Sequence, residues 1–220
     1  MESAVINPTP ARAPQGKREQ TKVQNRHMIL EAARGVFADM GYGAATVRDI
    51  IRATPLASGT FYNYFKSKEE IYQAIRDEAA LAIRPQLREE RQKAATVEEF
   101  ISATFRTFFE VVTRDEMNFR SIRHNADVSR MRVDTPEVVA GFDELREDIE
   151  TAIAKGVFPP IDADYLMAAI VGVAFEIMER ILSRENRDAK AAADFATALL
   201  LGGIRALPHV DVAIPNTDAA

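Results

Sequence analysis

The sequence predicts an all-α protein of about nine helices, with an N-terminal three-helix unit and a C-terminal helical body. Apolar side chains recur every three or four residues along most of the chain, which is the spacing of an amphipathic helix. Hydroxyl or carboxylate residues that can cap a helix precede many of these segments. No segment shows the two-residue alternation of a strand. The composition, 47% hydrophobic and 28% charged over 220 residues, is that of a chain that buries a core.

The N-terminal unit is expected to begin after a disordered arm. Residues 1–20 contain three prolines and no apolar period, which is typical of disorder. A first helix is predicted over about residues 22–40, because its apolar positions follow helical spacing. Gly41 follows it as a C-terminal cap.

Two short helices with a turn between them come next. Thr46 can cap the second helix, with Asp49 three residues later as its capping-box partner. That helix ends before Pro55, because proline disfavours the α conformation in the preceding residue. The third helix is predicted over about residues 58–65. Together residues 46–65 have the layout of a helix-turn-helix, a motif whose last helix enters the DNA major groove.

The rest of the chain is predicted to be helical as well. Ser67 and Glu70 form a second capping-box pattern, so a fourth helix should begin at Lys68. We therefore expect a helix-turn-helix domain over 21–67 and a helical body over 68–207. The further helices predicted are about 96–114, 116–125, 135–155, 162–185 and 188–207, followed by a frayed tail at 208–220.

The charge is divided unevenly along the chain. Residues 10–68 hold ten lysines and arginines against four acids, whereas the whole chain carries −5. A basic N-terminal third on an acidic remainder is typical of a DNA-binding head on a body with another role.

Several classes of protein are disfavoured. Cysteine is absent and the three histidines are scattered, so no metal or cofactor site is expected. The longest apolar run, residues 166–175, is too short to cross a bilayer. No signal peptide is apparent, so we expect a cytoplasmic protein without a membrane partner.

The third predicted helix has two unlike faces. On a helical wheel Phe61 and Phe65 lie together, while Gly59, Asn63 and Lys66 lie opposite. Glycine permits a close approach to the duplex, and an amide can pair with adenine. Hydroxyl, phenol and ammonium groups can anchor phosphates. The alternative is a small helical hairpin whose tyrosines and lysine merely face solvent. The candidate DNA contacts are Thr46, Arg48, Ser58, Gly59, Thr60, Tyr62, Asn63, Tyr64, Lys66 and Lys68.

These residues resemble the TetR family of transcriptional regulators over about residues 23–83. The resemblance is carried by the segments Ile29–Ala33, Phe37, Gly41-Tyr42, Thr46–Ile50, Gly59–Phe65 and Lys68–Glu70. It implies a homodimer with N-terminal DNA-binding heads, a C-terminal domain that binds a small ligand, and dimerisation through the last two long helices. Two positions depart from the family pattern: Pro55 replaces a turn glycine, and Ala57 replaces a capping serine.

The body offers two candidate surfaces. Small residues on the last two long helices could let two subunits pack closely, or could belong to the chain's own core. The candidate interface residues are Ala168, Ala169, Gly172, Ala196, Leu200 and Gly203. Aromatic and methionine residues with a few polar groups could line a ligand pocket, or could be core and an internal ion-pair network. The candidate pocket residues are Phe105, Phe108, Phe109, Phe119, Arg123, His124, Phe175, Met178 and Glu179.

The function that these patterns favour is a ligand-responsive transcriptional regulator. The family resemblance implies a repressor, which as a dimer would bind a palindromic operator and be released by a small-molecule effector. A constitutive architectural DNA-binding protein without an effector is the alternative, and a cavity in the body would distinguish the two. An all-helical enzyme is disfavoured because no catalytic motif is present. The operator and the effector are not identified by the sequence.

Overall fold

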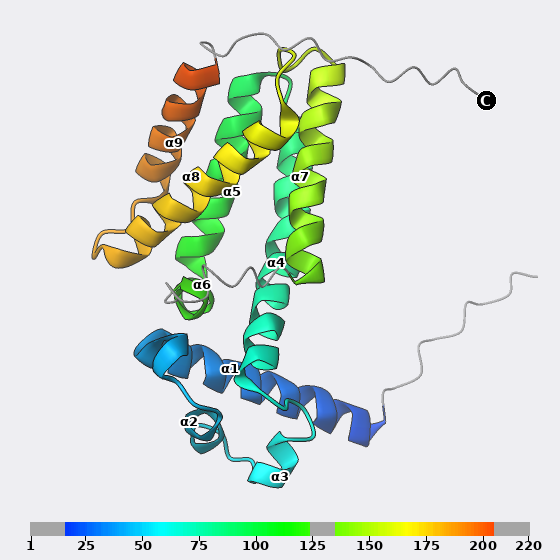
Figure 1. Ribbon diagram of the computed structural model, residues 1–220, viewed down its shortest axis with the longest axis vertical. Helices are drawn as coiled ribbons and strands as arrows, with labels where there is room; N and C mark the ends of the chain where they lie inside the picture. The colour runs from blue at the N-terminus through cyan, green and yellow to red at the C-terminus, as the bar shows by residue number, and fades with distance from the viewer. Residues whose placement is uncertain (1–15, 124–134, 205–220) are drawn as a thin grey trace, which may run out of the picture.

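The computed structural model describes residues 16–123 and 135–204, and within them it contains nine helices and no strand (Figure 1). The prediction of an all-α fold of about nine helices is confirmed. The helices are α1 Lys17–Ala44, α2 Val47–Arg52, α3 Ser58–Phe61, α4 Lys68–Lys93, α5 Val97–Arg114, α6 Glu116–Arg123, α7 Pro136–Ala154, α8 Ala163–Ser183 and α9 Ala189–Ile204.

Two hydrophobic clusters divide the described residues. The N-terminal cluster joins α1, α2 and α3 to the first turns of α4, around the fully buried Phe37, Ile50 and Phe61. The second cluster fills the body between the rest of α4 and α5 to α9. Helix α4 contributes Ile75 to the first cluster and Ile83 to the second, so it is the long element that joins them (Figure 1).

Helix α1 is longer than predicted at its N-terminal end. It begins at Lys17 behind Gly16, so residues 17–20 of the predicted arm are helical. Gly41, with φ of 75°, interrupts the helix where a C-terminal cap was predicted. Residues 1–15 of the predicted arm and the predicted tail at 208–220 lie outside the described residues.

Side-chain caps fix where α2 and α4 begin, and these two helices lie before and after α3 in the chain. The Thr46 hydroxyl accepts from the Asp49 N–H at 3.3 Å, and the Asp49 carboxylate accepts from the Thr46 N–H at 3.0 Å, so the predicted capping box is present. At α4 the box is incomplete. Ser67 accepts from the Glu70 N–H, but the Glu70 carboxylate accepts from the Lys66 N–H instead of that of Ser67.

The body contains one buried ion pair that was not predicted. Arg91 on α4 donates through Nε to Asp148 on α7 at 2.8 Å, and the two side chains are 2% and 8% exposed. Burial lowers the pKa of Arg91 and the hydrogen bond to Asp148 opposes that effect. The pair ties α4 to α7, because either charge left alone in this position would be costly.

Candidate functional site

The turn between α2 and α3 forms without glycine. Thr54 donates its hydroxyl hydrogen to the Ile51 carbonyl at 2.8 Å and accepts from the Leu56 N–H at 3.4 Å. Pro55 sits between these two contacts. Among the described residues no residue other than glycine has a positive φ, so the turn needs no left-handed residue here.

Helix α3 is shorter than predicted. It covers only Ser58–Phe61, and Ala57, the N-cap residue, makes no side-chain capping hydrogen bond. Beyond Phe61 the chain tightens: the Asn63 N–H donates to the Thr60 carbonyl and the Tyr64 N–H to the Phe61 carbonyl, both three residues back. The remainder of the predicted helix is therefore a run of tight turns.

The two faces predicted for residues 58–66 are present despite the shorter helix. Phe61 is 0% exposed and Phe65 is 5% exposed. On the other side Gly59, Asn63 and Lys66 are all exposed. We call these three residues, together with Tyr62, which is half-exposed, the recognition surface.

The other candidate DNA contacts fall into two groups. Thr46, Arg48 and Ser58 are exposed. Thr60 and Tyr64 are half-buried, and the Tyr64 hydroxyl accepts from the Asn25 side-chain amide at 3.1 Å. Because its hydroxyl bonds to α1, Tyr64 helps to hold the recognition surface against the first helix.

Lys68 has a structural role that the sequence did not indicate. Its ammonium group donates to the carbonyls of Tyr42 at 2.8 Å and Ala45 at 3.0 Å, and lies 4.4 Å from the centre of the Tyr42 ring. The Tyr42 hydroxyl in turn donates to Glu69 at 2.8 Å, which lowers the pKa of that carboxyl group. Lys68 therefore caps the C-terminal end of α1, and these contacts compete with any contact to DNA.

A buried arginine joins the N-terminal unit to the body. Arg34 on α1 is 7% exposed. Its Nε donates to Asn118 on α6 at 3.0 Å, its Nη2 to Glu78 on α4 at 2.6 Å, and its Nη1 to Glu31. We call this group the Arg34 cluster. It connects three helices around one cation.

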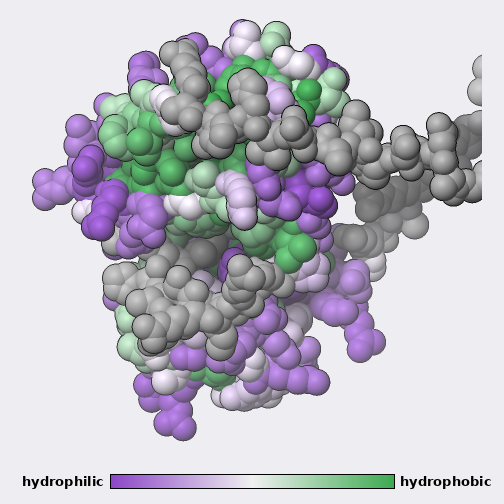
Figure 2. Space-filling model, turned by 45° about the horizontal axis from the view of Figure 1, so that its top comes forward, coloured by the Kyte–Doolittle hydropathy of each residue, from purple (hydrophilic) through white to green (hydrophobic). Residues whose placement is uncertain are grey.

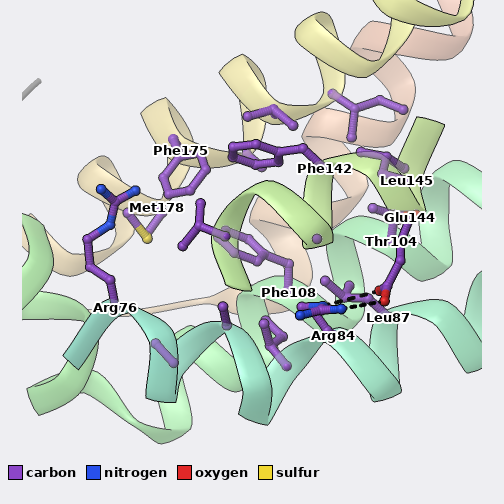
Figure 3. Close-up of a pocket in the computed structure, with 18 of the residues that line it drawn as sticks. Arg76, Arg84, Leu87, Thr104, Phe108, Phe142, Glu144, Leu145, Phe175 and Met178 are labelled. Carbon is purple, nitrogen blue, oxygen red and sulfur yellow. Dashed lines mark hydrogen bonds and ion pairs between the residues drawn. The ribbon is translucent and has the colours of Figure 1, made fainter. Parts of the chain in front are cut away.

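A cavity of about 150 Å³ lies in the body between α4, α5, α6, α7 and α8. Figure 3 shows Phe108, Phe142 and Phe175 directed into the same space, with Arg76 at one end and the paired Arg84 and Glu144 at the other. Most of the lining is aliphatic or aromatic, as is usual for a site that takes an apolar ligand.

The predicted pocket residues are only partly brought together. Phe108, Phe119, Phe175 and Met178 line the cavity. Phe105 and Phe109 are fully buried core residues that do not line it. Glu179 is also absent from the lining. The side chain of Arg123 and the whole of His124 lie outside what the structure describes.

The cavity-lining residues that were not predicted from the sequence lie mainly on α4 and α7. Arg84 crosses to α7, donating to Glu137 and, at 2.5 Å, to Glu144. A side chain at Gly141 would bring a Cβ within 3.3 Å of Arg84, so the glycine leaves room for that crossing. Helical periodicity marked these positions as helical, but it does not show which helices face each other.

The predicted interface residues lie mostly on the surface. Ala168, Ala169, Gly172 and Gly203 are exposed, and Leu200 is half-buried. Ala196 is fully buried in the body's own core, so it is not available to a partner. Large apolar side chains lie exposed on the same two helices: Tyr165, Phe175, Phe195 and Leu199. Figure 2 shows hydrophobic surface on the body and mainly hydrophilic surface at the N-terminal end.

Neither a metal site nor a membrane span is found in the described ranges. No three histidine or carboxylate side chains there gather as a metal site would require. No described helix is both long enough and apolar enough to cross a bilayer.

Comparison with known proteins identifies the N-terminal unit. Residues 29–75 match the family model described as "Bacterial regulatory proteins, tetR family". A curated relative, the HTH-type transcriptional regulator YhgD of Bacillus subtilis (strain 168), is 23% identical over 147 residues, covering 64% of this chain and 76% of the relative.

Solved structures extend the similarity to the body. The fatty acid degradation regulator FadR from Bacillus halodurans superimposes with a TM-score of 0.71 at 26% identity, covering 82% of this chain and 96% of that one. FadR from Bacillus subtilis, solved in complex with stearoyl-CoA, gives a TM-score of 0.70 at 22% identity, with coverage of 80% and 98%.

The fold and the helix-turn-helix together define a transcriptional regulator that binds DNA. The capped α2, the turn at Pro55 and the two-faced α3 lie inside the segment that the family model matches. Residues 29–75 are those of the DNA-binding unit of the TetR family of bacterial regulatory proteins.

Lys66 and Lys68 lie two residues apart and should have different roles, Lys66 in DNA binding and Lys68 in the stability of the fold. Lys68→Gln removes charged hydrogen bonds to the end of α1 and should lower the free energy of unfolding by about 1–3 kcal/mol. Lys66→Gln, at an exposed side chain, should change stability by less than about 0.5 kcal/mol but weaken binding to any duplex. Urea denaturation and fluorescence anisotropy measure the two effects. Equal stability losses in both variants would contradict the role given to Lys68.

Proposed function

We propose that this protein is a dimeric repressor that binds a two-fold symmetric operator and leaves it when a small apolar effector fills the body. The observation that carries this proposal is the exposed recognition surface on a helix-turn-helix in the same chain as a mostly apolar cavity. We assign DNA binding to residues 21–67, and ligand binding and dimerisation to residues 68–207. The cavity favours effector control over a constitutive architectural role.

Recognition of the operator is assigned to the exposed surface of α3 and the turns that follow it. Gly59 lets the backbone approach the duplex, Asn63 offers an amide to a base edge, and Lys66 offers a cation to phosphate. Phe61 and Phe65 face inward and hold this surface against α1 and α4. Arg48, and Thr46 at the start of α2, are exposed and would contact the DNA backbone.

Self-association is assigned to the exposed apolar surface of α8 and α9. Tyr165 is 79% exposed and Phe195 is 63% exposed, with small exposed residues between aromatic ones on α8. A hollow of about 650 Å³ lies where α8 leads into α9, lined by apolar residues such as Ile177 and Phe195 and by the polar residues Arg180, Arg184, Asn186 and Asp188. A second copy that covers this surface would remove the apolar side chains from water. The two recognition surfaces could then meet successive major grooves, about 34–36 Å apart.

The effector proposed is a molecule with an apolar chain, such as a fatty acyl group, around which the cavity of about 150 Å³ would have to widen. The cavity is lined by Phe108, Phe142, Phe175 and Met178, and Arg76 places a cation at one end. The two similar regulators named FadR support this class, since one is a fatty acid degradation regulator and the other was solved with stearoyl-CoA.

The Arg34 cluster offers a route from the cavity to DNA. Phe119 lines the cavity, and the preceding residue on α6, Asn118, accepts the hydrogen bond from Arg34 on α1. A ligand that displaces Phe119 would move α6 and disturb the Arg34 cluster. The effector can release the protein from the operator only if it binds the DNA-free arrangement of the helices more tightly than the DNA-bound arrangement.

Asn63→Ala tests the assignment of base recognition. Duplexes selected from a random pool by the unaltered protein provide the operator. Loss of a bidentate contact should weaken operator binding by about 1–3 kcal/mol per half-site and leave non-specific binding nearly unchanged. Anisotropy titrations at fixed salt measure both. Unchanged operator affinity would remove Asn63 from the recognition surface.

Ala169→Glu tests the proposed dimer. A charge introduced into the apolar surface of α8 should give monomers, because burying an unpaired carboxylate is costly. Ala82→Glu, at an exposed alanine of α4, is the matched control and should leave the dimer intact. Sedimentation velocity gives the mass of each variant. Dimers of Ala169→Glu would place the interface elsewhere.

Effector control is tested with stearoyl-CoA and with free coenzyme A as its control. Stearoyl-CoA should weaken operator binding by about 5- to 150-fold, the usual range of coupling between two sites, and coenzyme A should not. The Asn118→Ala variant should still bind stearoyl-CoA, as measured by calorimetry. Stearoyl-CoA should, however, weaken operator binding by this variant less than it weakens operator binding by the unaltered protein. If stearoyl-CoA neither binds nor releases the operator, the acyl class of effector is wrong. If stearoyl-CoA weakens operator binding equally in Asn118→Ala and in the unaltered protein, the Arg34 cluster does not transmit the effect of the ligand to the DNA-binding unit.

A further inference from the structure

The first turns of α1 extend beyond the N-terminal hydrophobic cluster. Residues 18–24 are all exposed, and the first buried residue of the helix is Ile29. A helix that buries none of its first turns gains nothing from packing there, so its sequence is free to serve another purpose. Residues 17–26 include four cationic side chains and one acidic one, Glu19.

One face of this extension is continuous with the recognition surface. Asn25 donates to the Tyr64 hydroxyl at 3.1 Å, and the Arg26 guanidinium lies 5.6 Å from the centre of the Phe65 ring. These two contacts fix which side of α1 meets the segment after α3. Arg18, Lys22 and Asn25 are spaced four and three residues apart, so they share that side of the helix.

Arg18 and Lys22, the two cations on this face, are not neutralised by any residue in the described ranges 16–123 and 135–204. Arg26 pairs with Glu78 at 2.7 Å. Neither Arg18 nor Lys22 has an ion-pair partner among the residues that the structure describes. At about 1.5 Å per residue, Lys22 lies about 4.5 Å and Arg18 about 10.5 Å along the helix from Asn25. In Figure 1 this end of α1 slopes toward the same end of the molecule as α3.

We propose that Arg18 and Lys22 form a basic ridge that binds phosphates of duplex DNA beside the site that α3 occupies. The ridge would extend each half-site contact outward without reading bases, because exposed ammonium and guanidinium groups recognise the phosphate backbone. A DNA duplex is the partner because the ridge is cationic and joins the surface that the proposed function assigns to DNA. This inference rests on that proposed function.

The test is the salt dependence of binding to a random-sequence duplex of about 30 base pairs, which needs no known operator. Each phosphate contact contributes about 0.9 to the slope of log K against log salt. Arg18→Gln with Lys22→Gln should make the slope shallower by roughly two per bound protomer. Arg18→Lys with Lys22→Arg should keep the slope, because the charges remain.

The matched control changes the same charge far from the ridge. Arg106→Gln with Lys155→Gln alters one exposed arginine and one exposed lysine of the body and should leave the slope unchanged. If the ridge variant and this control give the same slope while the unaltered protein binds, the ridge proposal is wrong and the proposed function stands. If the unaltered protein binds no duplex at low salt, the proposed function itself fails.

Discussion

Arg34 is a buried cation whose partners come from three helices. A guanidinium removed from water is destabilising unless its N–H groups are paired, and each nitrogen of Arg34 has an acceptor. Those acceptors are on α1, α4 and α6, so the charge is satisfied only when the three helices keep this arrangement. The orientation of the helix-turn-helix on the body therefore depends on this set of polar contacts as well as on α4, which contributes side chains to both hydrophobic clusters.

Local signals in the sequence predicted local structure well. Thr46 and Asp49 form the capping box that their spacing indicated, Gly41 breaks α1, and Phe61 faces inward as the helical wheel required. Each of these depends on residues within four positions of one another. The prediction for 58–65 was too long at its C-terminal end, because the chain tightens into turns after Phe61.

Contacts between distant segments were not predicted. Lys68 bonds to carbonyls more than twenty residues earlier, and no periodicity indicates such a pairing. The cavity wall from α7, with Gly141 and Phe142, was missed for the same reason, and the aromatic residues Phe105 and Phe109 proved to be core. A helical pattern shows that a residue faces inward, but the choice between core and cavity depends on how several helices pack together.

Phe175 lines the cavity and is also 40% exposed on the outer face of α8. Under the proposed function, Phe175 is subject to two constraints, one from the effector in the cavity and one from the second copy that covers α8. A change of Phe175 that alters ligand preference would then also alter the proposed dimer surface, whereas Val138 and Phe142 line the cavity from α7. Biosensor engineering that starts from this scaffold should randomise α7 before α8.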